Sequence, residues 1–319
     1  MGYTVFIGDV ARDEYYQVEQ FPRLGEKISM RFVSEELGGM IANAAAVYSA
    51  YGGQARFLSF LNPCDEDLCR QLNQQGIDTS LVTFDETLAP SKYVIYLADN
   101  EHTVFISDMK RHPVELPEQT QKVLCGADSI YSSYWELQWL RQGKKGAAEI
   151  VREWAEHGVK LICDVDVDAV LGEEYSRFIP YTHILCMNKV GFEKLCNGRS
   201  GSQSVKELHR QGLETCIVTL ADEGCRVYHK GDPLLEIPAV KTEVVDVTGA
   251  GDTFCSTFLW GCQNLRSFAL AAQFATYAAA RSITLLGARS GAAGIRPVLD
   301  FIEQHDPGKE FLIEILPYL

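Results

Sequence analysis

The chain has 319 residues, 46% of them hydrophobic, and a formal net charge of −14 at pH 7. This length can bury a large core as one big α/β domain or as two smaller ones. The acidic balance argues against nucleic acid or an anionic membrane surface as a partner and accords with solubility. The 10 cysteines are scattered without a C-x-x-C pair, which favours free thiols in a reducing compartment over a zinc site or disulfide scaffold.

Apolar stretches that could span a bilayer are missing from the sequence. The most apolar helix expected, over 268–286, is interrupted by Gln273 and Arg281. The N-terminus reaches Asp9 before the core of a signal peptide could form. We therefore expect a cytoplasmic protein.

The N-terminal third of the chain mixes strand and helix signals. A buried strand is expected over 3–7, and two short, partly exposed strands are expected within 14–34. The next elements expected are a helix over 40–51, a strand over 56–61, a polar helix over 65–75, and strands over 92–97 and 103–107.

After Pro117 the pattern changes to a regular alternation of strands and helices. We expect strands at 129–134, 160–165, 183–187 and 216–220, helices at 144–157, 205–211, 253–263 and 267–280, and a hairpin at 226–237. Such alternation predicts a parallel sheet covered by helices on both faces. The strand groups 14–34 and 91–107 do not fit this rhythm. We expect them to form a small antiparallel lid, inserted in a single domain over 1–319.

The stretch 242–258 carries the strongest functional signal. Val244 and Val245 resemble the end of a strand, and the small residues of Gly249-Ala250-Gly251 let the backbone approach a ligand closely. An apolar helix follows, and the free N–H groups at its start attract anions such as phosphate. A carboxylate repels phosphate, so Asp252 is unexpected at such a site. Its presence is explained if phosphate is transferred to a hydroxyl and Asp252 accepts the proton of that hydroxyl. The alternative is that Asp252 only caps the helix.

The segment D-V-T-G-A-G-D, Asp246 to Asp252, resembles the C-terminal signature of the ribokinase-like, or PfkB-type, carbohydrate kinases. This resemblance implies the ribokinase-like three-layer α/β fold, a mostly parallel sheet with helices on both faces and a small antiparallel β lid. It also implies transfer of the γ-phosphoryl group of ATP, with Mg²⁺, to a sugar hydroxyl. Asp252 would be the general base, and the backbone of Gly249, Ala250 and Gly251 would be the anion hole.

The N-terminal half is similar to the sugar site of the same family. The matching positions are Asp13 after the first strand, the pair Gly38 and Gly39, and Asn43. A carboxylate can accept hydrogen bonds from two hydroxyls, an amide can donate and accept, and a glycine pair lets a sugar ring lie on the backbone. The alternatives are a turn at the end of a strand and an ordinary helix start.

The nucleotide side also resembles the family, with departures. Thr219 and Gly224 match a strand and turn beside the nucleotide, although a glycine usual in that turn is Ala221 here. Asn188 matches the first position of an Asn-x-x-Glu motif tied to magnesium and phosphate, but Gly191 stands at the glutamate position. The protein's support for the metal is therefore reduced, although Mg²⁺ usually keeps several waters and phosphates as ligands.

Two further departures bear on the substrate. The segment 61–65 lacks the Gly-Asp pair usual in the family. Asp168 stands where kinases of keto-deoxy sugar acids in this family carry an arginine. An aspartate does not bind a substrate carboxylate, so we expect a small neutral sugar.

Some members of the family are activated by a monovalent cation, and the resemblance places Asp246 and Thr248 beside that site, with a loop near 283–290. Oxygen ligands of this kind suit K⁺. The alternative is that Asp246 caps the turn into Val247. The lid could also pair two subunits into a homodimer, because an exposed sheet with one apolar face needs a partner.

Other functions fit the sequence less well. It has no Walker-type G-x4-G-K-[ST] motif, and the glycine run at Gly249 lacks the third glycine of a dinucleotide fingerprint. A nucleoside kinase of the same fold remains an alternative, since its sugar site would be similar. A catalytically silent sugar-binding regulator is another, although the presence of Asp252 argues against it.

Overall fold

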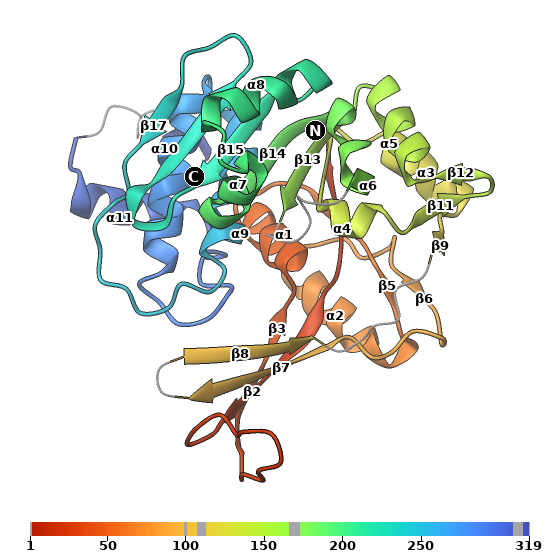
Figure 1. The fold of residues 1–319 in the computed structure, drawn as a ribbon, viewed down its shortest axis with the longest axis vertical. Helices are drawn as coiled ribbons and strands as arrows, with labels where there is room; N and C mark the ends of the chain where they lie inside the picture. The colour runs from red at the N-terminus through yellow and green to blue at the C-terminus, as the bar shows by residue number, and fades with distance from the viewer. Residues whose placement is uncertain (1, 99–100, 107–112, 166–172, 309–314, 319) are drawn as a thin grey trace.

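The computed structural model describes residues 2–98, 101–106, 113–165, 173–308 and 315–318. Its body is an eight-stranded sheet with the strand order β17-β16-β15-β14-β13-β10-β1-β4 (Figure 1). The strands are β1 (Thr4–Ile7), β4 (Ala55–Leu58), β10 (Ser129–Ser132), β13 (Lys160–Val165), β14 (Thr182–Asn188), β15 (Thr215–Thr219), β16 (Cys225–His229) and β17 (Leu235–Ile237).

The strand directions agree with the predicted architecture. The six strands from β4 to β15 are parallel, while β16 and β17 add the predicted hairpin in antiparallel pairing. Two small sheets flank the body, and they consist of β5 (Phe60–Leu61) with β6 (Thr83–Phe84) and of β9 (Val114–Glu115), β11 (Leu140–Gln142) and β12 (Lys145–Gly146). The strand predicted over 56–61 is thus divided between the main sheet and a small one.

Helices cover both faces of the sheet, because successive side chains of a buried strand point to opposite faces. In β1, Phe6 packs into one apolar core, and Val5 and Ile7 pack into the other. The first core is closed by α1 (Met40–Ala50), α2 (Glu66–Gln74), α9 (Ala250–Asn264), α10 (Phe268–Ser282) and α11 (Ile295–His305). The second is closed by α3 (Glu118–Cys125), α4 (Tyr134–Leu137), α5 (Ala147–Glu156), α6 (Glu173–Ser176), α7 (Lys189–Cys196) and α8 (Gly201–Gln211).

A second sheet projects from the body and is called the lid below (Figure 1). It has the order β3-β2-β7-β8 and consists of β2 (Ala11–Gln17), β3 (Arg31–Gly38), β7 (Lys92–Ala98) and β8 (Glu101–Ile106). The predicted small sheet outside the parallel body is confirmed. Its outer pairs are antiparallel, whereas the central strands β2 and β7 run parallel, since both leave the body in the same direction.

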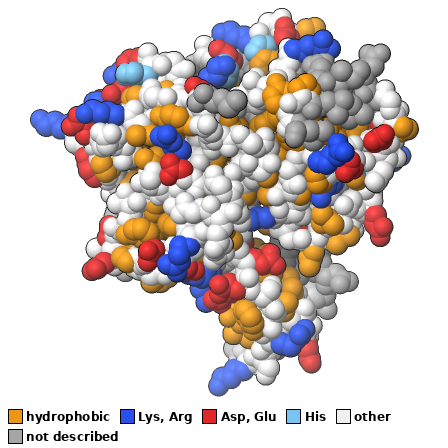
Figure 2. Space-filling model, turned by 180° about the vertical axis from the view of Figure 1, so that it is seen from behind, with side chains coloured by type: hydrophobic (Ala, Val, Ile, Leu, Met, Phe, Trp, Pro, Cys, Tyr) orange, Lys and Arg blue, Asp and Glu red, His pale blue; other side chains and the backbone are white. Residues whose placement is uncertain are grey.

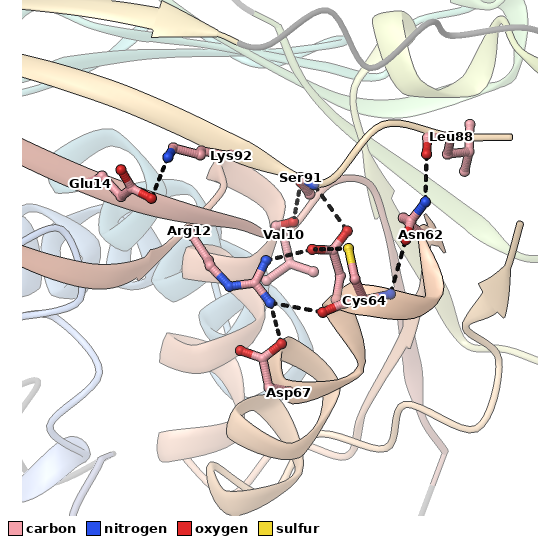
Figure 3. A network of polar contacts seen from close by, with 10 residues as sticks. Val10, Arg12, Glu14, Asn62, Cys64, Asp67, Leu88, Ser91 and Lys92 are labelled. Atoms are coloured by element: carbon pink, nitrogen blue, oxygen red, sulfur yellow. Dashed lines mark hydrogen bonds and ion pairs between the residues drawn. The ribbon is translucent and has the colours of Figure 1, made fainter. Parts of the chain in front are cut away.

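A partly buried ion-pair network joins the lid to the body (Figure 3). Arg12 at the start of β2 contacts the carboxylates of Asp65 and Asp67 next to and within α2. Asp65 is fully buried, and its second oxygen accepts a hydrogen bond of 2.9 Å from the backbone N–H of Ser91, just before β7. The hydroxyl of Ser91 donates to the carbonyl of Val10 at 2.7 Å. One carboxylate therefore fixes the bases of both central lid strands.

One predicted element is wrong. Val244 and Val245 do not end a strand; they lie in an extended segment with 59% and 55% of their surface exposed. The N–H of Val245 bonds instead to the carbonyl of Ile283 at 2.8 Å, which ties the segment to the end of α10. A pair of β-branched residues favours a strand locally, but no strand among the described residues pairs with this segment. Within the described residues, the helices are too short or too polar to cross a membrane.

Candidate active site

Three aspartates, of which only Asp252 is a predicted site residue, collect at the carboxyl ends of the parallel strands. Asp9 follows β1, Asp164 lies near the end of β13, and Asp252 lies in the first turn of α9. In open α/β sheets this edge is where ligands bind, because strand ends and helix starts converge there. The lid starts from the same edge, and the Tyr93 hydroxyl of β7 donates a hydrogen bond to the carboxylate of Asp9.

Asn43 and Asp252, predicted for sugar binding and for base catalysis, are in direct contact. The side-chain amide of Asn43 donates to Asp252 Oδ2 at 2.8 Å across 209 positions of sequence. The carbonyl oxygen of the same amide accepts from Arg289 Nε at 3.0 Å. Arg289 also donates from Nη1 to the side chain of Gln75 at 2.6 Å. The three side chains Arg289, Asn43 and Asp252 thus form one continuous chain of hydrogen bonds.

Asp13 is the second buried carboxylate of the site. It lies in β2 with 8% of its surface exposed, and its Oδ1 is buried without a hydrogen-bond partner among the described residues. Gly38 of β3 lies directly beside it, since a Cβ at this position would come within 2.0 Å of Asp13 Oδ2. Gly39 precedes α1, the helix that carries Asn43. The structure therefore brings together all four residues predicted for the sugar site.

Burial and like charges raise the pKa of both carboxylates. The pKa of Asp252 is raised to about 7, first by burial and then by Asp164 and Asp9, while Asn43 and Arg289 oppose the shift. The pKa of Asp13 is also raised to about 7, by burial and by Asp9 and Glu36 against the charge of Arg289. A carboxylate tuned to this range can accept a proton at neutral pH. This is the property that a general base needs.

The start of α9 presents free backbone donors next to Asp252. Gly249 precedes the helix with φ of +73°, and a Cβ there would meet the carbonyl of Ala288 at 2.0 Å. Within the described part of the chain, the N–H groups of Gly251 and Asp252 have no acceptor, while that of Ala250 bonds to the carbonyl of Val247 at 3.2 Å. Such donors at a helix start can bind an anion.

The residues predicted for the nucleotide side lie at the ends of β14 and β15. Asn188 and Thr219 are register partners in these strands. The Asn188 side chain accepts from the N–H of Gly191 at 2.8 Å and so caps α7. Gly224 closes the turn that joins β15 to β16, and Ala221 in this turn has φ of +52°, a left-handed conformation that favours glycine. The departure at Ala221 therefore has a measurable backbone cost.

Asp246 holds a turn and a loop together. Its Oδ1 accepts from the N–H and the hydroxyl of Thr248 at 2.9 and 2.7 Å, and its Oδ2 accepts from the N–H of Gly287 at 3.0 Å. The predicted proximity of Asp246 to the loop near 283–290 is thus present. These bonds match the capping alternative.

Sequence reasoning assigned no role to Arg289, although this residue lies within the loop near 283–290. It carries no family motif, and only its place beside α9 brings it to Asn43, 246 positions away. It also missed Asp164, whose Oδ2 accepts from the Tyr131 hydroxyl at 2.9 Å. Asp168, on which the preference for a neutral sugar rests, lies outside the described residues.

A mostly apolar pocket lies beside Asp9. Its wall includes side chains from the end of β4, from the segment before β7, from the start of β11 and from the residue that precedes β11. The apolar residues of this lining include Leu58, Leu61, Leu88, Trp139 and Leu140. The pocket therefore begins at a carboxylate next to the sugar-site residues and continues over apolar surface.

The fold and the site are those of a ribokinase-like kinase, with a small second sheet beside the mostly parallel one and a carboxylate at a helix start that has free N–H groups among the described residues. The model of the pfkB family carbohydrate kinases matches residues 1–293, and the chain belongs to this family. The expected class of enzyme, an ATP-dependent carbohydrate kinase, is thereby confirmed.

Individual relatives match most of the chain. The ribokinase of Haemophilus influenzae is 24% identical over 307 residues, which are 93% of this chain and 97% of that protein. The nucleoside kinase of Methanocaldococcus jannaschii is 27% identical, over 79% of this chain and 81% of that protein. The solved structure of Arabidopsis thaliana ribokinase complexed with ribose and ATP has a TM-score of 0.80 at 21% identity, covering 95% and 99% of the chains. The expected fold is thereby confirmed.

Proposed function

We propose that the protein transfers the γ-phosphoryl group of ATP to a hydroxyl of a small neutral sugar. The observation that carries this proposal is the position of Asp252. Its carboxylate is linked to Asn43 at 2.8 Å and adjoins the free N–H groups at the start of α9. A proton acceptor beside an anion-binding helix start provides both groups that phosphoryl transfer to a hydroxyl requires.

The sugar lies against Asp13, Gly38, Gly39 and Asn43 in this proposal. A substrate hydroxyl supplies the missing hydrogen bond of Asp13 Oδ1 once the side chain or the lid adjusts. The preference for a neutral sugar rests on the sequence, where Asp168 stands at the position that an arginine occupies in kinases of keto-deoxy sugar acids.

Asp252 removes the proton from the attacking hydroxyl while the N–H groups of Gly249 and Gly251 receive the phosphoryl oxygens. The N–H of Ala250, also predicted for this anion hole, already bonds to the carbonyl of Val247 at 3.2 Å. The loop of Gly224 and the strand ends at Asn188 and Thr219 shape the nucleotide side. Within the described residues, no group of three acidic, histidine or cysteine side chains could hold a metal ion. Magnesium would therefore depend on ATP phosphates and water, which is its usual coordination. Activation by K⁺ at Asp246 and Thr248 remains part of the proposal.

A nucleoside is the second candidate substrate. The apolar pocket beside Asp9 can receive a flat apolar group attached to the sugar, and Trp139 offers an aromatic wall. The similarity to a nucleoside kinase supports this alternative. A free pentose or hexose would leave the pocket empty, so the two substrate classes are separable by assay.

We also propose that the lid closes over the sugar and pairs two subunits. Figure 2 shows hydrophobic side chains on the projecting part of the molecule. Phe32, Val104, Phe105 and Ile106 are each between 43% and 64% exposed. A sheet with such side chains gains stability by covering them with a second lid. Light scattering tests the pairing, and a monomer would contradict it without affecting the kinase assignment.

An assay that couples ADP release to a spectroscopic signal tests the proposed reaction. Neutral sugars, sugar acids and nucleosides are supplied one at a time with ATP and Mg²⁺. We expect turnover with a neutral sugar or with a nucleoside, and none with sugar acids. The Asp252→Asn variant is the control for contaminating kinases. Turnover confined to sugar acids would contradict the neutral-substrate proposal, and absence of turnover with every substrate would contradict the function.

A further inference from the structure

We propose that Arg289 is a positioning residue, which holds the Asn43 amide in the orientation that donates to Asp252. This inference rests on the proposed role of Asp252 as the base. Arg289 is not expected to touch the sugar or the phosphoryl group. It acts through Asn43 and through its positive charge.

The hydrogen-bonding chemistry of the three side chains fixes this orientation. A guanidinium only donates, so the Asn43 atom that faces Arg289 Nε at 3.0 Å must be the carbonyl oxygen. The amide nitrogen of Asn43 is then turned to Asp252 Oδ2 at 2.8 Å, where it donates. Without Arg289 the amide can rotate by half a turn and place its oxygen against the carboxylate. Such an orientation would repel the ionised form of Asp252.

The charges around Asp252 make this support necessary. Asp164 from β13 and Asp9 after β1 both disfavour its ionised form, in addition to burial. The groups that favour ionisation are the Asn43 amide from α1 and the charge of Arg289 from the loop before α11. Asp13 faces the same arginine, together with Asp9 and Glu36. Loss of Arg289 therefore removes one favourable charge directly and weakens the hydrogen bond from the Asn43 amide to Asp252.

Arg289 is well suited to this task because its own position is constrained. Nη1 donates to Gln75, which follows α2, at 2.6 Å and Nε donates to Asn43, while Nη2 is buried without a hydrogen-bond partner among the described residues. Burial lowers the pKa of Arg289 to about 10, against the charges of Asp13 and Asp252. The guanidinium thus stays protonated at neutral pH while its desolvation strengthens its effect on neighbouring carboxylates. A lysine could supply the charge, but not the fixed fork of donors.

The first test compares Arg289→Met with Arg281→Met in the full-length enzyme. Arg281 is the matched control, because it bonds from Nη1 to the carbonyl of Ser290 in the same loop at 3.0 Å. We expect Arg289→Met to lower kcat by roughly 10- to 100-fold and to move the acidic limb of the kcat profile to higher pH. Arg281→Met should leave that limb in place. An unmoved limb in Arg289→Met, or an equal shift in both variants, would overturn the proposal.

A double-mutant cycle separates action through Asn43 from an independent effect. If Arg289 acts largely through Asn43, adding Arg289→Met to Asn43→Ala should cost much less than the single change does in the wild type. Losses that simply multiply would overturn the positioning role. Arg289→Lys is the second variant in case Arg289→Met does not fold. In Arg289→Lys, the acidic limb of the kcat profile should stay closer to its original pH, while kcat should still fall. A kcat equal to that of the wild type would contradict the need for the fixed donors of the guanidinium.

A substrate-free measurement keeps this inference distinct from the proposed function. The carboxyl ¹³C resonance of Asp252, assigned by its loss in Asp252→Asn, is followed by NMR through a pH titration. We expect the midpoint to rise in Arg289→Met by about one pH unit and to stay in place in Arg281→Met. An unchanged midpoint would overturn the proposal even if the enzyme is an active kinase. A shifted midpoint in a protein without kinase activity would support the coupling of these residues while contradicting the function.

Discussion

The sugar side and the nucleotide side of the site are built in different ways. On the sugar side, Asn43 donates to Asp252 at 2.8 Å and accepts from Arg289 at 3.0 Å, and each bond spans more than 200 positions of sequence. On the nucleotide side, the Asn188 side chain accepts a hydrogen bond from the N–H of Gly191, three residues ahead, and Gly224 closes a turn. One side is an assembly of side chains, and the other is a set of backbone conformations held by local interactions.

This difference predicts where substitutions act. A side chain on the sugar side should affect chemistry and sugar affinity with little change in local folding. A side chain on the nucleotide side should affect the backbone first and ATP through it. The predictions below test this distinction, from the largest expected effect to the smallest.

Asp252→Asn should have the largest effect. It keeps the size of the side chain and removes the proton acceptor, so kcat should fall by roughly 10²–10⁴-fold with sugar and ATP binding almost unchanged. Steady-state kinetics and calorimetric binding measure the two quantities. Thermal unfolding serves as the control. Turnover equal to that of the wild type would remove Asp252 from the mechanism.

Asp13→Ala should weaken sugar binding by about 1–3 kcal/mol, which is roughly a 5- to 150-fold rise in the sugar's KM. The reason is the loss of a charge-assisted acceptor for the sugar hydroxyls. The KM for ATP should stay the same, because Asp13 lies in the lid strand β2. Kinetics with each substrate varied in turn provide the measurement. A change in the KM for ATP alone would reverse the assignment of the two substrates to the two sides of the site.

Activity and stability should respond to pH in opposite directions. The pKa values of Asp13 and Asp252 are raised from 3.8 to about 7, so kcat/KM should fall about tenfold or more per unit below pH 7. Between pH 3.8 and 7 the folded state binds more protons than the unfolded state at these groups. Their contribution to the free energy of unfolding therefore decreases as pH rises through this window.

The comparison of wild type with an Asp13→Asn, Asp252→Asn double variant isolates this contribution. Denaturant unfolding at several pH values should show a smaller decrease of stability with rising pH in the double variant. Identical pH dependence in the two proteins would contradict the raised pKa values.

Asn188→Ala should cost about 1 kcal/mol of stability, because it removes the cap of α7. We expect a rise of a few-fold in the KM for ATP as the helix start loosens. Asn188→Ser is the matched variant, since serine also caps a helix. It should restore both quantities. Restored stability with a persistently high KM would instead indicate direct contact between Asn188 and the nucleotide.

Ala221→Gly should give the smallest effect, and a favourable one. Relief of the left-handed conformation at φ +52° outweighs the extra chain entropy of glycine, so stability should rise by about 0.5 kcal/mol. Ala279→Gly within α10 is the control and should lower stability. Denaturant unfolding measures both. A loss of stability in Ala221→Gly would mean that this turn adapts better to alanine than its backbone indicates.

The difference between long-range side-chain contacts and local backbone interactions also explains which features the sequence could predict. The alternation of strands and helices predicted the sheet and its layers, and the family motifs selected Asp13, Asn43 and Asp252, which the fold places near one another. These signals are local or belong to a family motif. The contact of Arg289 with Asn43 could not be predicted, because it forms only when the fold brings α1 and the loop before α11 together. Val244 and Val245 were misjudged because their preference for a strand is local, while pairing requires a neighbour. The parallel pairing of β2 with β7 depends on the body between them.

The joint at Asp65 has a consequence for protein engineering. Arg12 and Ser91 both attach to this carboxylate, so the two central lid strands share one anchor (Figure 3). A lid taken from a relative with another substrate range could be grafted as a unit if the graft keeps these two attachment points. A graft that replaced only one strand would leave half of the anchor unsatisfied. The lid could in this sense be exchanged as a unit through its shared anchor at Asp65.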